Sequence, residues 1–485
     1  MERRRTVVER RLGLVILGGI VIFAAILLIT GRHDASAPPP AALLPDAKKV
    51  LAADPLAWTP SRTTAYEQAA AAGLAHVLYA KSPGGLAASA ARTATWRPLI
   101  EQATRGTSIP ANTLEAIVLL ESAGRPEAQA GSLDGAVGLT QILAETGSSL
   151  LGMHVDVAAS RRLSRQIDRA DLLGQARRGE RLRAQRRRVD QRFDPKAELA
   201  ATVRYLELAH SRLGRDDLAI ASYHMGIGNL QTALSRYGAA RVPYAQLYFD
   251  TTPLRHAAAW RFLASLGDDS STYLWRIGAA RNAMALLRSD RSRLQRLSDL
   301  QTRADDAALA LHPPGSTASY GDADALKGAY ADGTLVELPA AYLAARGVRV
   351  DPSVGVRAPQ ADGDPRLYRG LRREALATLA YIGSQVARIA PGDAPLHLAG
   401  AVRDTSYARA EVVHGDPVGP LATTGWTFDI ARRYASRTQA VALQYVLDRL
   451  TALNLIAWQR TPSTIQVTAA SGASRLEAPE GVRGA

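Results

Sequence analysis

The 485-residue chain contains no cysteine. Disulfides, thiol catalysis, lipid attachment at cysteine and cysteine-ligated metals are therefore excluded. This absence does not fix the compartment, because exported bacterial proteins can also lack cysteine. Apolar residues make up 47% of the chain. That fraction supports hydrophobic cores, and the length suits two or three domains.

Charge is unevenly distributed along the chain. The net charge is +14, of which residues 161–192, with twelve arginines and four acids, carry +8. The first eleven residues add +3, and the rest of the chain is nearly balanced. The positive charge therefore belongs to two short segments.

An uncharged run at residues 12–30 follows the basic segment 1–11. Nineteen helical residues span the apolar core of a bilayer, about 30 Å. The preceding arginines predict a cytoplasmic N-terminus and an extracytoplasmic chain. A cleavable signal peptide is the alternative, with Ala35-Ser36-Ala37 as a cleavage site. The apolar region of signal peptides is about 7–15 residues, so the length favours an uncleaved single-pass membrane anchor.

Composition and periodicity divide the remainder into segments. We expect a mainly α domain followed by a smaller α+β domain, with strands in PLHLAGAVRD, LIAWQR and STIQVTAA beside helices 366–389 and 431–452. The predicted segments are a Pro/Ala tether 31–46, a helical lead-in 47–91, a helical domain 92–245, a helical extension 246–311, a linker 312–330, an α+β domain 331–469 and a disordered tail 470–485.

The arginine-rich segment 161–192 is predicted to be a helical insertion in the domain 92–245. Its heptad-like apolar positions are Leu163, Ile167, Leu172, Leu173 and Leu182. Within ARRGERLRAQRRRVDQRFDP (176–195), the acids Glu180, Asp190 and Asp194 are too few to neutralise the arginines. A solvated helical arm is one interpretation, and a contact with anionic wall polymer or lipid headgroups is the other. Nucleic acid is not expected as a partner outside the cytoplasm.

The helix AIVLLES ends its apolar stripe on an acid. Leu114, Ile117 and Val118 precede Glu121 by seven, four and three residues, which places all four on one helical face. Burial disfavours the charged form of a carboxyl group, which suits a general acid. A helix-end acid paired with Arg125 is the alternative.

Two further motifs follow in order. The segment DGAVGLTQ (134–141) contains glycines that permit close backbone approach, and Gln141 can hold the polar groups of a sugar. The segment ASYHMG (221–226) ends an apolar helix in Tyr223 and His224. Tyr223 is either a core aromatic or a hydroxyl that steadies the acid and the sugar, and His224 either faces a ligand or is a satisfied core histidine.

These motifs resemble the catalytic domain of soluble lytic transglycosylases, which have the goose-type lysozyme fold. That family has Glu-Ser, then Gly-Ala-x-Gly-Leu-Met-Gln, then Ala-x-x-Tyr-Asn-x-Gly. The similarity covers residues 92–245, and FDPKAELAATVRYLELAH (193–210) also matches it. Thr140 replaces the usual Met, His224 the usual Asn and Ala144 the common Pro.

The resemblance implies cleavage of peptidoglycan by one acid. Glu121 would protonate the oxygen between N-acetylmuramic acid and N-acetylglucosamine, and the acetamido group of the substrate would stabilise the cation. Glu121 would then take a proton from the C6 hydroxyl, closing a 1,6-anhydro ring. Ser122, Gln141, Tyr223 and His224 would hold the substrate, without a metal or another cofactor. A muramidase that hydrolyses the same bond and a non-catalytic peptidoglycan-binding scaffold remain as alternatives.

A second resemblance, to zinc D-Ala-D-Ala carboxypeptidases, lies at residues 397–434. That family reads Ser-x-His-x-x-Gly-x-Ala-x-Asp, of which Gly425 and Asp429 match. Ala422 replaces the first histidine ligand, Pro420 replaces Ser, and no histidine follows His414. One remaining ligand cannot hold tetrahedral zinc, so we expect a degenerate domain with no metal. Asp429 is then expected to be a helix-start or structural acid.

Overall fold

The computed structural model describes residues 54–304, 306–356, 364–413 and 418–476. This part of the chain is mainly helical, with a small sheet region. It divides into two compact units. We call residues 88–231 and 266–273 the motif unit, because they contain all three motifs. Residues 54–87, 232–265 and 274–476 form the sheet unit.

None of the helices in the described ranges is both long and apolar enough to cross a bilayer. The predicted anchor 12–30, its basic flank 1–11 and the tether 31–46 lie outside those ranges.

The motif unit is built almost entirely of helices. Its elements, including those that begin or end in the other unit, are α4 Leu86–Ala94, α5 Arg97–Thr104, α6 Ala111–Ser122, β1 Ala136–Val137, β2 Ile142–Leu143, η3 Thr146–Leu150, α7 Val157–Leu172, α8 Ala176–Val189, η4 Gln191–Phe193, α9 Pro195–Leu213, α10 Asp216–Met225, α11 Ile227–Tyr237 and η5 Ser270–Thr272. Strands β1 and β2 pair antiparallel; β1 lies within the second motif, and β2 follows it directly.

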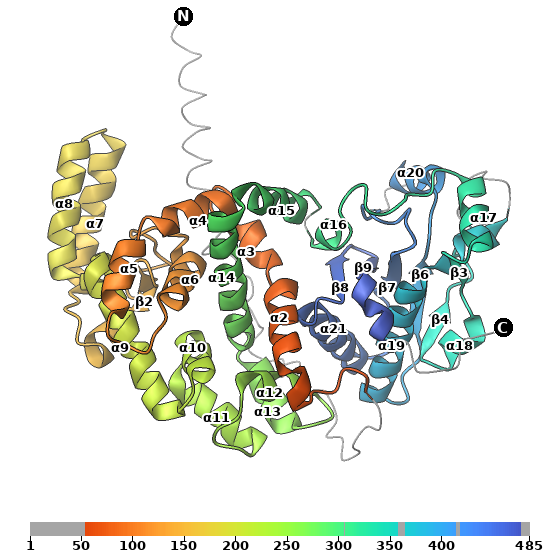
Figure 1. Cartoon of the computed structure of the whole chain (residues 1–485), viewed down its shortest axis with the longest axis horizontal. Coiled ribbons are helices and arrows are strands. Elements are labelled where there is room, and N and C mark those ends of the chain that lie inside the picture. The colour runs from red at the N-terminus through yellow and green to blue at the C-terminus, as the bar shows by residue number, and fades with distance from the viewer. Residues whose placement is uncertain (1–53, 305, 357–363, 414–417, 477–485) are drawn as a thin grey trace, which may run out of the picture. The chain divides into compact units, whose positions relative to one another are not determined.

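The segment 161–192 is helical over most of its length, as predicted, and α7 and α8 form an antiparallel hairpin (Figure 1). The side chain of Asp156 caps α7 by accepting from the backbone N–H of Ala159. Asp194 caps α9 in the same way, with Pro195 as the first helical residue. These caps satisfy helix-end donors, so acids and proline fix where the helices begin.

The sheet unit contains helices that precede the motif unit in the sequence as well as helices that follow it. Its helical elements are η2 Pro60–Arg62, α2 Thr63–Gly73, α3 His76–Lys81, α12 Tyr244–Phe249, α13 Ala257–Ser265, α14 Tyr273–Ser289, α15 Arg291–Arg303, α16 Ala308–Leu311, α17 Ala323–Ala331, α18 Ala340–Ala344, η6 Pro365–Tyr368, α19 Arg373–Ile389, α20 Thr405–Val413, α21 Arg437–Ala452 and η7 Ser471–Leu476. The helical lead-in and extension are therefore helical where they are described.

A five-stranded mixed sheet has the order β4-β6-β7-β9-β8. Its strands are β4 Val348–Val350, β6 Leu396–Gly400, β7 Thr427–Ala431, β9 Thr464–Ala469 and β8 Ile456–Arg460. Only β4 and β6 are parallel. A separate pair joins β3 Val336–Glu337 to β5 Gly370–Leu371. Helices α19 and α21 pack against each other and against the sheet (Figure 1).

The three predicted strands are confirmed, but the predicted helix starts at 366 and 431 are wrong. The helices begin at Arg373 and Arg437. Residues 427–431 instead form the buried strand β7, which pairs with strands on both sides. A central position satisfies the backbone donors and acceptors of this apolar segment, which a surface helix start would not require.

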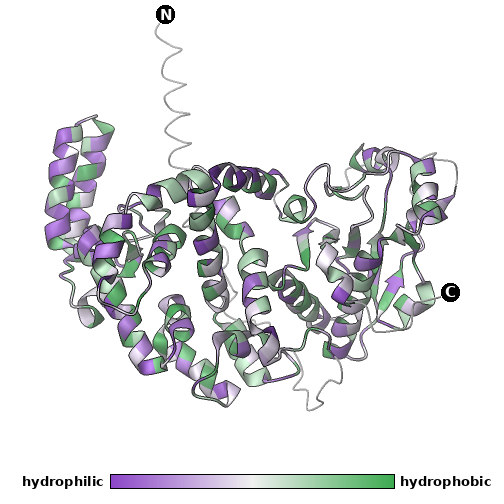
Figure 2. Ribbon diagram, viewed as in Figure 1, coloured by the Kyte–Doolittle hydropathy of each residue, from purple (hydrophilic) through white to green (hydrophobic). Residues whose placement is uncertain are grey.

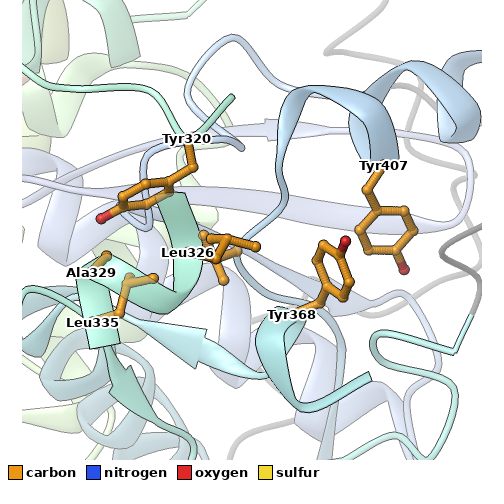
Figure 3. Packing of buried hydrophobic residues seen from close by; sticks show 7 residues of the cluster. Tyr320, Leu326, Ala329, Leu335, Tyr368 and Tyr407 are labelled. Carbon is orange, nitrogen blue, oxygen red and sulfur yellow. The ribbon is translucent and has the colours of Figure 1, made fainter. Parts of the chain in front are cut away.

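The predicted linker 312–330 is wrong, because it belongs to a core. Figure 3 shows side chains of a buried cluster made of Tyr320, Leu326, Ala329, Leu335, Tyr368, Val402 and Tyr407. His312 is also buried, with its Nε2 2.7 Å from the carbonyl oxygen of Ala469. Glycine and proline mark turns in this segment, whereas its aromatic and leucine side chains pack inside.

The predicted disordered tail begins too early. Residues 471–476 form the short helix η7, in which Ala473 and Leu476 are buried and which packs against α19. Two apolar side chains were enough to attach this segment to the core despite its polar composition. The rest of the predicted tail, 477–485, lies outside the described residues.

Candidate functional site

Helix α6 presents Glu121 at the end of a buried stripe, as the sequence predicts. Leu114, Ile117 and Val118 are fully buried, whereas Glu121 is only half-buried. The helix stops because Ala123 adopts a left-handed conformation with φ 55° and its N–H bonds to Leu119. The glutamate is therefore held by a rigid helix and still reaches the surface.

The hydroxyl of Tyr273 donates a hydrogen bond to Oε1 of Glu121, at 2.7 Å. Tyr273 is 1% exposed. Burial, and secondly the charge of Glu121, raise the pKa of Tyr273 well above its ordinary value. The hydroxyl therefore stays a neutral donor, and it fixes one oxygen of the carboxyl group.

Helix α10 supplies two further rings, which stack on Tyr273. The rings of Tyr223 and His224 stack on the ring of Tyr273, with centroids 6.2 Å and 5.3 Å away. The Tyr223 hydroxyl donates to the backbone oxygen of Thr140 at 2.8 Å. The structure thus brings the first, second and third motifs together around Tyr273.

His224 is exposed and is not a core histidine. Its Nδ1 lies 2.8 Å from the hydroxyl oxygen of Ser270, and its Nε2 lies 3.6 Å from a carboxylate oxygen of Asp269. The loop that carries Tyr273 therefore also orients the imidazole. A ring held in this way can present its edge to a ligand.

A buried carboxylate positions the second motif. Glu198 on α9 accepts hydrogen bonds from the backbone N–H of Leu139 at 2.7 Å and of Thr140 at 2.8 Å. Gly138 has φ +93°, and a Cβ there would lie 2.4 Å from a Glu198 oxygen. Only glycine fits at this position, because both the space and the backbone conformation exclude a side chain.

Glu198 is also the start of a polar chain that leads to the site. Burial raises its pKa to about 8, although the donors from Thr140 and Leu139 oppose that shift. The Thr140 hydroxyl donates to Glu198, and the Thr202 hydroxyl donates to Thr140 at 2.8 Å. Thr202 and Tyr223 hydroxyl oxygens are 3.4 Å apart. Threonine at position 140 thus links the buried acid to Tyr223.

The side chains of Gln141 and Ser122 mostly serve their own backbone. Gln141 has φ 55°, and its amide nitrogen donates to the carbonyls of Gly138 and Ala128. Its Oε1 is then the atom that can accept from a sugar hydroxyl. Ser122 is 1% exposed and donates to the Val118 carbonyl. Ser122 therefore belongs to the helix end rather than to a ligand-binding surface.

Sequence reasoning missed Tyr273 and the role of Glu198. Tyr273 is 152 residues from Glu121, in the segment assigned as a helical extension, and no local pattern marks it. Glu198 lies in the segment 193–210, where its signal was an acid within an apolar helical pattern. Tyr273 also shows that the site is not confined to residues 92–245, because 266–273 joins the motif unit.

The C-terminal end of the arginine-rich segment is buried and holds the fold together, rather than being exposed to solvent. Arg192 is fully buried, pairs with Asp190 at 2.9 Å and donates to the carbonyls of Gly135 and Leu133. The prediction of a basic insertion that runs to residue 192 is therefore wrong at this end. Arg192 instead fastens the base of the hairpin to the second-motif loop.

The acid of the second resemblance has a different setting. Asp429 lies on β7, is 3% exposed and accepts from Nη2 of Arg403 at 2.5 Å. Arg403 also pairs with Glu411. A Cβ at Gly400 would lie 2.4 Å from the Asp429 carboxylate. Asp429 is therefore a structural acid in a strand and not a helix-start acid.

Comparison of the chain with protein families, with curated proteins and with solved structures finds no match. In the described ranges, no three histidine, aspartate or glutamate residues are grouped so that they could hold a metal ion. The absence of zinc stays a prediction.

Proposed function

We propose that this chain is a peptidoglycan lytic transglycosylase with a lysozyme-like catalytic domain in the motif unit. The observation that carries the proposal is the hydrogen bond from Tyr273 to Glu121 at the end of a buried helix. Around it lie Tyr223 and His224, which the resemblance implies as sugar contacts. The arrangement supplies one positioned carboxyl group and an aromatic, hydroxyl-bearing surface, which suits a carbohydrate.

The reaction requires Glu121 to act twice. As an acid it gives its proton to the glycosidic oxygen, so the bond from the muramic acid C1 to that oxygen breaks and the leaving sugar gains a hydroxyl group. The acetamido oxygen of the substrate stabilises the cation at C1. Glu121, now a carboxylate, accepts the C6 hydroxyl proton while the C6 oxygen bonds to C1. The carboxyl group is then protonated again, and one molecule has become two without water.

Ordinary glycosidases need two carboxyl groups, one of which acts as nucleophile or activates water. Glu198 contacts the second motif, but this acid is fully buried and accepts hydrogen bonds from the backbone of that motif. Its position supports a mechanism with a single acting acid. A muramidase that uses the same acid with water is the alternative outcome.

The remaining assignments accompany this proposal. Peptidoglycan strands would be the substrate and partner, residues 12–30 would anchor the chain in the cell membrane, and the bulk of the chain would be extracytoplasmic. Residues 331–469, which are part of the sheet unit, would be a degenerate peptidase-like domain without zinc. None of these steps needs a cofactor.

The test is mass analysis of purified peptidoglycan after incubation with the protein. We expect muropeptides with 1,6-anhydro ends, about 18 Da lighter than hydrolysed ones because no water is added. Products with reducing ends would instead assign a muramidase. Absence of any released muropeptide from folded protein would favour the non-catalytic scaffold and contradict the proposal.

A further inference from the structure

The hairpin α7–α8 ends in two exposed leucines. Leu172 is 87% exposed and Leu173 is 58% exposed, although the other apolar residues of the hairpin, such as Ile167 and Leu182, pack between its helices. Exposed large apolar residues at the tip of a projecting element mark an interaction site when charge or shape surrounds them. The leucines have no role in the hairpin's own core.

Arginines lead to this tip along both helices. On α7, Arg162, Arg165, Arg169 and Leu172 are spaced three, four and three residues apart, so they follow one helical face. On α8, Arg177, Arg181 and Arg188 also share a face. The exposed arginines of the hairpin that make no ion pair within the described ranges are Arg162, Arg165, Arg169, Arg177, Arg178, Arg181 and Arg188. Figure 2 shows many hydrophilic residues, interrupted by hydrophobic ones, along the ribbons of α7 and α8.

Acids reduce the positive charge of the hairpin only locally. Arg183 pairs with Asp171 and Glu180, so these two carboxylates are already bound. Asp168 lies beside Asp171, and burial together with that neighbour raises the pKa of Asp168. The arginine-bearing faces of α7 and α8, which we call the arginine stripes, therefore keep an excess of positive charge beside the apolar tip.

The base of the hairpin is rigidly fixed to the motif unit. The guanidinium of Arg186 lies 3.7 Å from the centroid of the Phe193 ring and pairs with Glu127. Arg192 ties the end of the hairpin to the second-motif loop. The tip is thus held at a set position relative to Glu121, within one compact unit.

We propose that the hairpin tip docks on an anionic lipid surface, with Leu172 and Leu173 entering the headgroup boundary and the arginine stripes contacting lipid phosphates. Amphipathic elements bind membranes through apolar burial together with attraction to anionic lipids. A soluble anionic polymer would use the arginines but gives no reason for two exposed leucines. The pairing of both features at one tip favours the lipid surface.

The absence of cysteine permits a direct test on the full chain. Gln175→Cys, exposed at the tip, introduces the only thiol, which can carry an environment-sensitive fluorophore. The labelled chain is reconstituted into vesicles of phosphatidylcholine alone or of phosphatidylcholine with phosphatidylglycerol. We expect a blue shift of the emission only in the anionic vesicles. A control label at Ser211→Cys, on the exposed end of α9, should show none.

Two variants separate the contributions of the leucines and the arginines. Leu172→Ser with Leu173→Ser should abolish the blue shift. Arg165→Gln, Arg169→Gln and Arg181→Gln together should lower the equilibrium constant for tip insertion on the order of a hundredfold, since each basic residue near an anionic surface contributes roughly fivefold. The matched control, Arg105→Gln with Arg212→Gln and Arg241→Gln, removes three exposed charges elsewhere and should leave insertion unchanged.

Several results would overturn the docking proposal. These are equal emission in neutral and anionic vesicles, a blue shift that survives loss of both leucines, and a shift of the same size produced by polyphosphate without vesicles. The last result would assign the hairpin to a soluble polyanion. Release of muropeptides from soluble peptidoglycan fragments should be unaffected by these variants, so failure of docking and failure of the glycan-cleaving assignment are measured separately.

Discussion

Glu121 in the motif unit and Asp429 in the sheet unit are both carboxylates at positions that a resemblance connects with catalysis, but their settings differ. Glu121 is half-buried and receives a hydrogen bond from the neutral hydroxyl of Tyr273. Asp429 is 3% exposed and is bound by the guanidinium of Arg403. A phenol lets its partner gain and lose a proton, whereas a guanidinium stays charged and holds its partner as an anion. The partner and the exposure, rather than the acid itself, separate the chemical role that we propose for Glu121 from the structural role of Asp429.

The largest expected effect comes from Glu121→Gln. The amide keeps the shape and can still accept from Tyr273, but it has no transferable proton. Release of muropeptides should fall by about 10²–10⁴-fold or more, while the free energy of unfolding changes little. Digestion assays and urea unfolding measure the two quantities. Glu207→Gln, an exposed acid-to-amide change on α9, is the control, and activity close to the parent in Glu121→Gln would remove the catalytic assignment.

The mirror change, Asp429→Asn, should give the opposite result. It weakens a buried ion pair, which typically costs 3–5 kcal/mol when one partner is lost. Because Glu411 still pairs with Arg403, we expect a loss at the lower end, about 3 kcal/mol. Glycan cleavage per folded molecule should be unchanged. Asp299→Asn, an exposed change in the same unit, should stay within about 0.5 kcal/mol. Loss of cleavage by folded Asp429→Asn would break the comparison.

Removing only the hydroxyl of Tyr273 tests whether the partner of Glu121 accounts for its difference from Asp429. Tyr273→Phe keeps the stacked rings but loses the hydrogen bond to Glu121, and a bond to a charged group contributes about 1.5–3 kcal/mol. We expect kcat to fall by roughly tenfold to a hundredfold, with a smaller change in KM. Tyr205→Phe is the matched control, because it also removes a buried tyrosine hydroxyl, one that donates to the carbonyl oxygen of Ser222 rather than to Glu121. Equal losses of kcat in both variants would mean that the Tyr273 hydroxyl acts through packing.

A smaller effect should appear in the pH dependence of stability through Glu198. Its pKa rises from an ordinary 4.5 to about 8 in the folded state. The folded protein therefore keeps this proton at pH values where the unfolded chain has lost it. The resulting stabilisation is complete below about pH 4.5 and is lost as pH rises toward 8, by at most about 1.4 kcal/mol per pH unit.

Glu198→Gln removes that titration and leaves one backbone donor of the second motif without its acceptor. The variant should be less stable than the parent by roughly 1–3 kcal/mol at pH 5, and the difference should shrink toward pH 8. Urea unfolding at several pH values measures it, with Glu207→Gln as the control. A difference that is constant from pH 5 to 8, or that grows with pH, would show that Glu198 is ionised in the folded protein.

The sequence by itself determined the features that depend on local pattern. The stripe Leu114, Ile117 and Val118 is buried with Glu121 at its end, and the hairpin and three strands of the sheet form where period and composition indicate. These elements follow from side-chain spacing, which chain neighbours alone set. The same reasoning failed at 312–330 and 470–476, because turn residues and polar composition hide a few apolar side chains that pack in a core.

Only the tertiary structure decided which groups surround the two acids. Tyr273 reaches Glu121 across 152 residues of sequence, and Arg403 reaches Asp429 across a strand pairing. In the sequence, Glu198 cannot be distinguished from other helical acids. In the structure, Gly138 packs against its carboxyl group and the backbone N–H of Thr140 donates to it. The ability of a carboxyl group to exchange a proton depends on burial and on the charge of its partner. Both are properties of long-range contacts, which no pattern along the chain records.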